Sequence, residues 1–351
     1  MPLRRLFADR AALEGGPIGP RVEKALSFVE GLKNANAGFF RANPGTVDRF
    51  DKIKDQNRNY LAHEYFNQDW TPFYFADVAA DLSAAKLSYV GSTALLEQID
   101  AINLTADQRN LLAEIGDTAH RETIKDYIIN QQFRRDVFVK GPVALAPRTA
   151  REAWLEQRFA LSVPRADIEL KVTGSQGEAT LQPEVYTPVL DQLADGPKTV
   201  REMSSDPKVG GLGWARLQEA LLVLTGAGHL QPCLPGKHQG ARYKATKAFN
   251  QAVMTRAQDS GDLQSLASPV TGGGVAVGRF QQLFLKAFLE GKKEPEGWAE
   301  AAWEVLAGQG QKIVKDGKPL ETPEENVAEL REQARVFADK TFPVLKSLQV
   351  I

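Results

Sequence analysis

The sequence has little of what defines most small secreted, metal-binding and membrane proteins. Its 351 residues include one cysteine, Cys233, which excludes a disulfide framework and a thiolate-based metal site. It has four scattered histidines and no apolar run near the ~20 residues that cross a bilayer. Arg4 and Arg5 are not followed by the apolar segment of a secretory signal. These absences predict a cytoplasmic protein that binds no metal and has no membrane partner.

The chain also lacks an excess of either charge. Forty-three Lys and Arg residues oppose forty-four Asp and Glu residues, which gives a net charge of −1. This balance excludes the broad basic footprint of a general nucleic-acid binder, although it leaves room for a local basic patch. With 43% hydrophobic and 25% charged residues, the composition is that of a globular protein of about two domains.

No catalytic motif is complete. His63-Glu64 begins like the zinc-protease motif H-E-x-x-H, but Asn67 stands where the second histidine belongs. The glycines from Gly272 onward fail the dinucleotide-binding spacing G-x-G-x-x-G at Val277. A nucleophile elbow and a phosphate-binding P-loop are absent from the sequence. We therefore predict no catalytic, cofactor-binding or metal-binding residue in this chain.

Hydrophobic periodicity predicts a mainly α fold with small β elements, an α+β arrangement in four segments. A helical middle domain is followed by a winged-helix-like subdomain and a C-terminal helical segment. The predicted boundaries are 1–60 for lead-in helices and a linker, 61–165 for a helical core, 166–262 for the winged-helix-like subdomain and 263–351 for the C-terminal helices.

Local signals support this division. Thr105 with Gln108 has the spacing of a helix-capping box, and Thr199 is a predicted N-cap. Residues 183–196 and 214–228 are predicted helices, whereas 168–174 alternates as a strand does. Residues 229–234 and 241–247 are predicted strands flanking a turn, which would form the wing. The Gly- and Lys-rich residues 308–319 are predicted to be a linker.

The predicted winged helix raises DNA binding as an alternative function. The third helix offers Arg216 and Gln218 for base contacts and then becomes apolar, so base recognition is weak. The wing is more basic, with Lys237, Arg242 and Lys244. We favour a protein-contact module and do not expect a nucleic-acid partner.

Aromatic and acidic residues concentrate between positions 63 and 77. Such a mixture can hold a lysine ammonium through cation–π attraction and a charge partner. The alternative is that the rings form a helix–helix corner and their polar tips make ordinary hydrogen bonds. The candidate substrate-binding residues are His63, Glu64, Tyr65, Asn67, Trp70, Tyr74, Phe75 and Asp77.

The same stretch carries a family resemblance. The strings HEYFN, PFYF, AKLSYVGS, RET…DY and NQQFRRDVFV occur in order over about eighty residues. They closely resemble the methyltransferase regulatory domain, which follows a class I S-adenosylmethionine-dependent catalytic domain in bacterial proteins. The later segments also resemble the C-terminal parts of those proteins. The resemblance implies that 61–165 is a regulatory core and that the substrate is a protein or another amine.

The resemblance also implies that the cofactor-binding domain lies upstream of this region. No E/D-x-G-x-G-x-G loop occurs near the N-terminus, and the first sixty residues resemble the linker behind such a domain. We therefore expect a noncatalytic regulatory or substrate-recognition portion, not active alone, whose partner is a class I catalytic domain upstream or on a separate chain. S-adenosylmethionine would be bound there. A stand-alone methyltransferase is the further alternative, and the methyl acceptor and a homo-oligomeric state stay open.

Overall fold

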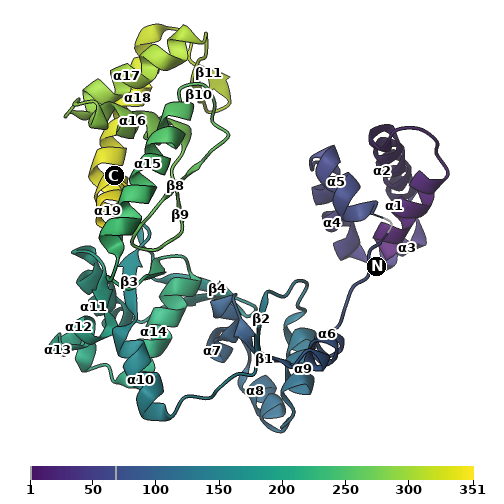
Figure 1. Ribbon diagram of the computed structural model, residues 1–351. Coiled ribbons are helices and arrows are strands. Elements are labelled where there is room, and N and C mark those ends of the chain that lie inside the picture. The colour runs from purple at the N-terminus through teal and green to yellow at the C-terminus, as the bar shows by residue number, and fades with distance from the viewer. Residues whose placement is uncertain (1, 68) are drawn as a thin grey trace. The chain divides into compact units, whose positions relative to one another are not determined.

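The computed structural model describes residues 2–67 and 69–351, which fold into two compact units, 1–74 and 75–351 (Figure 1). Helices dominate both units, and the strands of the described residues pair in small antiparallel sheets. The predicted mainly α fold with small β elements is therefore confirmed. Within the same residues, none of the helices combines the length and apolar character needed to cross a bilayer.

The first unit is a helical assembly with its own core. Phe7 is fully buried, and its ring lies 6.1 Å from that of Phe50 and 5.9 Å from that of Phe66, measured between centroids. Leu61 is buried in the same cluster. The helices are α1 (Pro2–Ala12), α2 (Ile18–Asn34), α3 (Gly38–Ala42), α4 (Pro44–Lys54) and α5 (Arg58–Tyr65).

The second unit begins with a small lobe built around one pair of antiparallel strands. Strands β1 (Leu87–Ser92) and β2 (Asp136–Lys140) pair antiparallel, with Tyr89 opposite Phe138. Thr105 and Gln108 form the predicted capping box at the start of a helix, which confirms that reading of the sequence. The other elements of the lobe are α6 (Phe75–Ala84), the 3-10 helix η1 (Leu95–Gln98), α7 (Asp100–Asn103), α8 (Ala106–Ala113) and α9 (Thr118–Ile129).

The middle of the second unit packs helices against a three-stranded sheet with the order β6-β3-β7. Leu190 and Leu221 are fully buried between the helices that were predicted at 183–196 and 214–228. Thr199 caps its helix as predicted. The elements are α10 (Pro147–Glu156), β3 (Arg158–Leu161), β4 (Lys171–Gly174), β5 (Gly177–Thr180), α11 (Pro183–Ala194), β6 (Lys198–Thr199), α12 (Val200–Ser204), α13 (Pro207–Gly210), α14 (Trp214–Gly226) and β7 (Leu230–Cys233).

The predicted strand at 241–247 is wrong. These residues lie in α15 (Gln239–Arg256), and β7 pairs with β3 instead of with them. The helix is favoured because it buries Asn250, Val253 and Met254 on one side. Arg242 also donates hydrogen bonds to the carbonyl oxygens of Pro235, Lys237 and Pro269, which holds the preceding turn against the helix.

The C-terminal part has a separate cluster of buried aromatic and aliphatic side chains. Phe288 and Phe342 meet edge to face at 4.9 Å, and Trp298 lies 5.4 Å from Phe342. The predicted linker at 308–319 contains a hairpin instead, in which Lys315 pairs with Lys318. The elements are β8 (Ser265–Ala267), β9 (Gly274–Ala276), α16 (Arg279–Leu289), α17 (Pro295–Gly308), β10 (Val314–Lys315), β11 (Lys318–Pro319), α18 (Pro323–Val336), a π-helical turn (Phe337–Thr341) and α19 (Phe342–Ser347).

Candidate functional site

The aromatic and acidic residues predicted as a substrate site divide between the two units, because the boundary falls between Tyr74 and Phe75. In the first unit, His63 and Glu64 are exposed on α5, and Asn67 and Tyr74 are also exposed. Tyr65 is partly buried, with its ring edge-on to Phe7 at 6.2 Å. Tyr65 therefore contributes to the core of its unit.

Trp70 already has a cation on its ring. The Arg4 guanidinium lies 4.7 Å from the centroid of the Trp70 ring, and Arg4 also donates a hydrogen bond to the carbonyl oxygen of Asn67. This cation–π contact is made by a side chain of the same unit and leaves the predicted binding of a substrate ammonium untested. A substrate ammonium would have to displace Arg4 from this face of the ring.

The two remaining predicted residues belong to the second unit. Asp77 is exposed in the first turn of α6. Phe75 is 4% exposed and packs edge-on against Tyr89, with 4.9 Å between the ring centroids. The Arg134 guanidinium lies 4.1 Å from the centroid of Phe75 on the ring face. Phe75 thus supports a charged cluster that the sequence did not single out, and the predicted substrate role of the eight residues stays a prediction.

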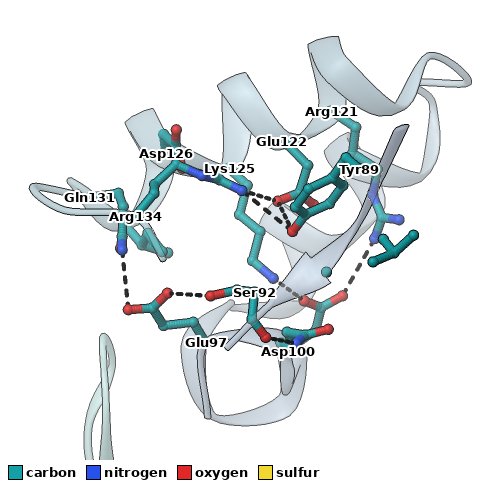
Figure 2. A pocket seen from close by; sticks show the side chains of 14 residues that line it. Tyr89, Ser92, Glu97, Asp100, Arg121, Glu122, Lys125, Asp126, Gln131 and Arg134 are labelled. Carbon is teal, nitrogen blue, oxygen red and sulfur yellow. Dashed lines mark hydrogen bonds and ion pairs between the residues drawn. The ribbon is translucent and has the colours of Figure 1, made fainter. Parts of the chain in front are cut away.

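That cluster borders a polar pocket of about 210 Å³ in the lobe at the start of the second unit (Figure 2). Strand β1, the η1–α7 segment, α9 and the chain that follows α9 provide its walls. Its charged and amide-bearing lining residues are Glu97, Gln98, Asp100, Arg121, Glu122, Lys125, Asp126, Gln131 and Arg134.

On one wall of the pocket, Arg134 forms ion pairs with three carboxylates. Its guanidinium contacts carboxylate oxygens of Glu122 at 2.9 Å, Asp126 at 2.5 Å and Asp136 at 2.7 Å. The Arg134 side chain is only 18% exposed. Burial raises the pKa of Asp126, although the positive charge of Arg134 acts against the rise. One cation therefore holds three carboxylates in partly dehydrated surroundings, and it fixes α9 to β2.

A second ion-pair group lies around Asp100. The buried Lys125 amine donates to Asp100 at 2.9 Å, and Arg121 approaches the other oxygen of the same carboxylate at 3.5 Å. This group therefore contains two cations and one anion. It ties α9 to α7 across the pocket.

Glu97 has a different environment. Its oxygens accept hydrogen bonds from the Gln131 amide at 3.1 Å and, weakly, from the Ser92 hydroxyl at 3.5 Å. Within the described part of the chain, no cation lies within 4.0 Å of this carboxylate. Figure 2 shows Ser92 between Glu97 and the Lys125–Asp100 pair. The arrangement suits the binding of a polar molecule and supplies no activated nucleophile.

The sequence contained a signal for this pocket that was not used. Most of its lining residues fall within the strings AKLSYVGS, RET…DY and NQQFRRDVFV, whereas Glu97, Gln98, Asp100 and Ile129 lie outside them. The relevant pattern is Arg121, Glu122, Lys125 and Asp126 along α9. Like charges lie four positions apart in this pattern, so these side chains need partners of opposite charge from other elements.

The basic residues considered for DNA binding do not form a wing, because Lys244 lies within α15 and Lys237 lies in the turn before it. Arg242 makes three hydrogen bonds to backbone carbonyls, so its guanidinium has a structural role. No described contact brings Arg216 to these residues. The geometry gives DNA binding no added support.

The residues that line this pocket lie within a segment that matches a known protein family. Residues 57–140 match the family model described as "Predicted methyltransferase regulatory domain". A curated relative from Synechocystis sp., the "Uncharacterized protein sll1526", is 40% identical over 349 residues, which is 99% of this chain and 68% of that protein. The chain belongs to the family of proteins that carry the methyltransferase regulatory domain.

Two solved structures share the fold at low sequence identity. PKMT2 from Rickettsia typhi in complex with AdoHcy has a TM-score of 0.61 and 16% identity, with 100% of this chain and 72% of that chain covered. A second structure of PKMT2 from Rickettsia typhi has a TM-score of 0.59 and 14% identity, covering 98% and 71%. These likenesses establish the fold, and the function of PKMT2 is not transferred with it.

Proposed function

We propose that this chain is the regulatory or substrate-recognition portion of a class I S-adenosylmethionine-dependent methyltransferase, acting on a protein or another amine. The observation that carries the proposal is that residues of the matched regulatory domain converge on one polar pocket. That pocket is built from paired charges and amides, which suits binding more than bond making. The match of nearly the whole chain to a longer relative also supports this role.

In this proposal the methyl-transfer chemistry belongs to a catalytic domain, either on the same polypeptide or on a separate chain. A class I domain holds its cofactor at a helix N-terminus that follows a strand of a parallel sheet. The pairings among the described strands are antiparallel and involve sheets of two or three strands. These elements do not fit S-adenosylmethionine, so we derive no catalytic step through this chain.

Calorimetry and reconstitution test the proposal together. We expect no saturable heat when S-adenosylmethionine is titrated into the purified chain, because the described elements offer no cofactor loop. Adding the chain to the class I catalytic domain encoded with it should change methyl transfer by about tenfold or more, the effect of ~1.4 kcal/mol on the transition state. Tight cofactor binding by the chain, or an unaltered rate with an excess of it, would refute the role.

The predicted aromatic acceptor site is tested in the same assay. Replacing Trp70 and Tyr74 together by alanine should lower kcat/KM by about tenfold, since a cation–π contact is worth up to ~2 kcal/mol when desolvated. Fold and cofactor affinity should be unchanged. The control is Tyr60→Ala, which removes an aromatic ring that is 49% exposed on α5. Equal rates for the double variant and the control would exclude these rings from substrate binding.

A further inference from the structure

The charges that line the pocket are not evenly compensated. Arg134 is shared by Glu122 and Asp126, and Asp100 has both Lys125 and Arg121 as partners. The described hydrogen bonds to the Glu97 carboxylate come only from neutral donors, the Ser92 hydroxyl and the Gln131 amide. One carboxylate in the pocket thus has no cation partner among the described residues, and an ammonium group would supply one.

The Asp100 side of the pocket has the opposite imbalance. Lys125 and Arg121 together bring two positive charges to a single carboxylate. The lysine ammonium has three donors, and Asp100 occupies one of them. The Arg121 contact with Asp100 is long, at 3.5 Å, and its side chain is 45% exposed. Donors therefore remain on this side for a second carboxylate.

We propose that the pocket binds a small zwitterion of the α-amino-acid class. The ammonium of the ligand donates to Glu97, and its carboxylate accepts from Lys125 and Arg121. Ser92 lies between these two groups in Figure 2 and also lines the pocket. The pocket is thereby a site for a free amino acid in the lobe at the start of the second unit.

The dimensions of the pocket favour a ligand of this size. Its volume of about 210 Å³ corresponds to roughly seven water molecules at ~30 Å³ each. Pockets for drug-sized ligands are larger, at roughly 300–1,000 Å³. A simple amine would not use the donors that Lys125 and Arg121 keep beyond their contacts with Asp100, and a simple anion would be repelled by Glu97. A zwitterion satisfies both sides at once.

The proposal is tested by titrating the standard L-amino acids into the full chain and following heat and thermal unfolding. We expect saturable binding of at least one of them. Its decarboxylated amine and its analogue without the α-amino group should each bind about tenfold or more weakly, because each loses a hydrogen bond to a charged group. Absence of saturable binding across the panel would overturn the proposal.

Three variants distinguish the two ends of the site. Glu97→Gln should weaken binding of the amino acid by about tenfold or more. Arg121→Gln should weaken binding of the amino acid and leave that of the decarboxylated amine unchanged. Glu114→Gln is the matched control, because Glu114 is an exposed carboxylate at the end of α8, outside the pocket lining. Undiminished binding to Glu97→Gln would also overturn the proposal.

The inference goes beyond the proposed function and can fail separately from it. Ligand binding is measured on this chain without any methyl transfer, so a negative titration leaves the regulatory role untouched. Conversely, a chain that binds an amino acid at Glu97 and leaves methyl transfer unaltered would keep this site and refute the proposed function.

Discussion

Replacing Arg134 by methionine should lower the free energy of unfolding by about 3–5 kcal/mol near neutral pH, because it breaks a buried ion-pair network on one side. Methionine keeps an unbranched apolar stem but leaves Glu122, Asp126 and Asp136 without their shared cation. It also removes the guanidinium from the Phe75 ring. Urea denaturation of the two proteins measures the loss.

The loss should depend on pH in a defined direction. Burial raises the pKa of Asp126 above its ordinary value even with Arg134 present. A carboxyl group whose pKa is higher in the folded state contributes stability that is present below its unfolded pKa and is lost as the pH rises through the folded pKa. Without the cation that opposes the rise, this pKa rises further. The difference in the free energy of unfolding between Arg134→Met and the native protein should therefore shrink as the pH falls from about 7 towards about 4.5.

Arg135→Met is the matched control, since Arg135 is the exposed neighbour of Arg134 in sequence. Its effect should stay within about 0.5 kcal/mol, as for most surface substitutions. An Arg134→Met variant as stable as this control at neutral pH would show that the network contributes nothing to folding. A loss that did not vary with pH would contradict the role given to Asp126.

Replacing Asn103 by alanine should lower the free energy of unfolding by about 3 kcal/mol, since it removes three side-chain hydrogen bonds worth about 1 kcal/mol each. The Asn103 amide donates to the carbonyl oxygens of Leu96 at 2.6 Å and Ile99 at 2.9 Å. Its side-chain oxygen accepts from the backbone N–H of Ser175 at 3.1 Å. Asn103 is 3% exposed, so water cannot replace these bonds without local opening.

The same substitution should loosen the pocket, because the η1–α7 segment held by Asn103 carries Glu97 and Asp100. Thermal unfolding and hydrogen exchange of residues 95–103 measure the two effects. Asn110→Ala on the exposed surface of α8 is the control and should stay within about 0.5 kcal/mol. Unchanged exchange in this segment would show that other contacts hold it in place.

The features that sequence reasoning predicted well are those set by neighbouring residues. The caps at Thr105 and Thr199 each depend on a partner three positions away, so their pattern is visible in the sequence. The buried leucines of α11 and α14 follow helical periodicity in the same way. Local signals of this kind identified α8, α11, α12 and α14 of the second unit.

The failures have identifiable physical causes. Residues 241–247 alternate as a strand does, but burial of Asn250 and Val253 further along the helix outweighs that local preference. The hairpin at 314–319 was predicted as a linker even though Asp316-Gly317 is a strong turn signal. Both turn residues have positive φ, at 50° and 78°, as a two-residue hairpin turn of this type requires.

The pocket was missed for a different reason. Glu97, Lys125 and Arg134 lie far apart in sequence, and only the pairing of β1 with β2 around α9 brings them together. By contrast, the aromatic and acidic residues between 63 and 77 are dense in sequence, but the fold divides them between two cores. Density along a chain is a poor guide to a site when a unit boundary crosses it.

The boundary between Tyr74 and Phe75 does not coincide with either limit of the family match. The family match runs from residue 57 to residue 140, and so it combines α5 of the first unit with the lobe of the second. A fragment of residues 57–140 would contain Leu61 but would lack Phe7 and Phe50, which belong to the same buried cluster. The matched segment 57–140 is therefore not a fragment that would keep all its packing contacts when produced alone. Only its residues 75–140 belong to a single structural unit.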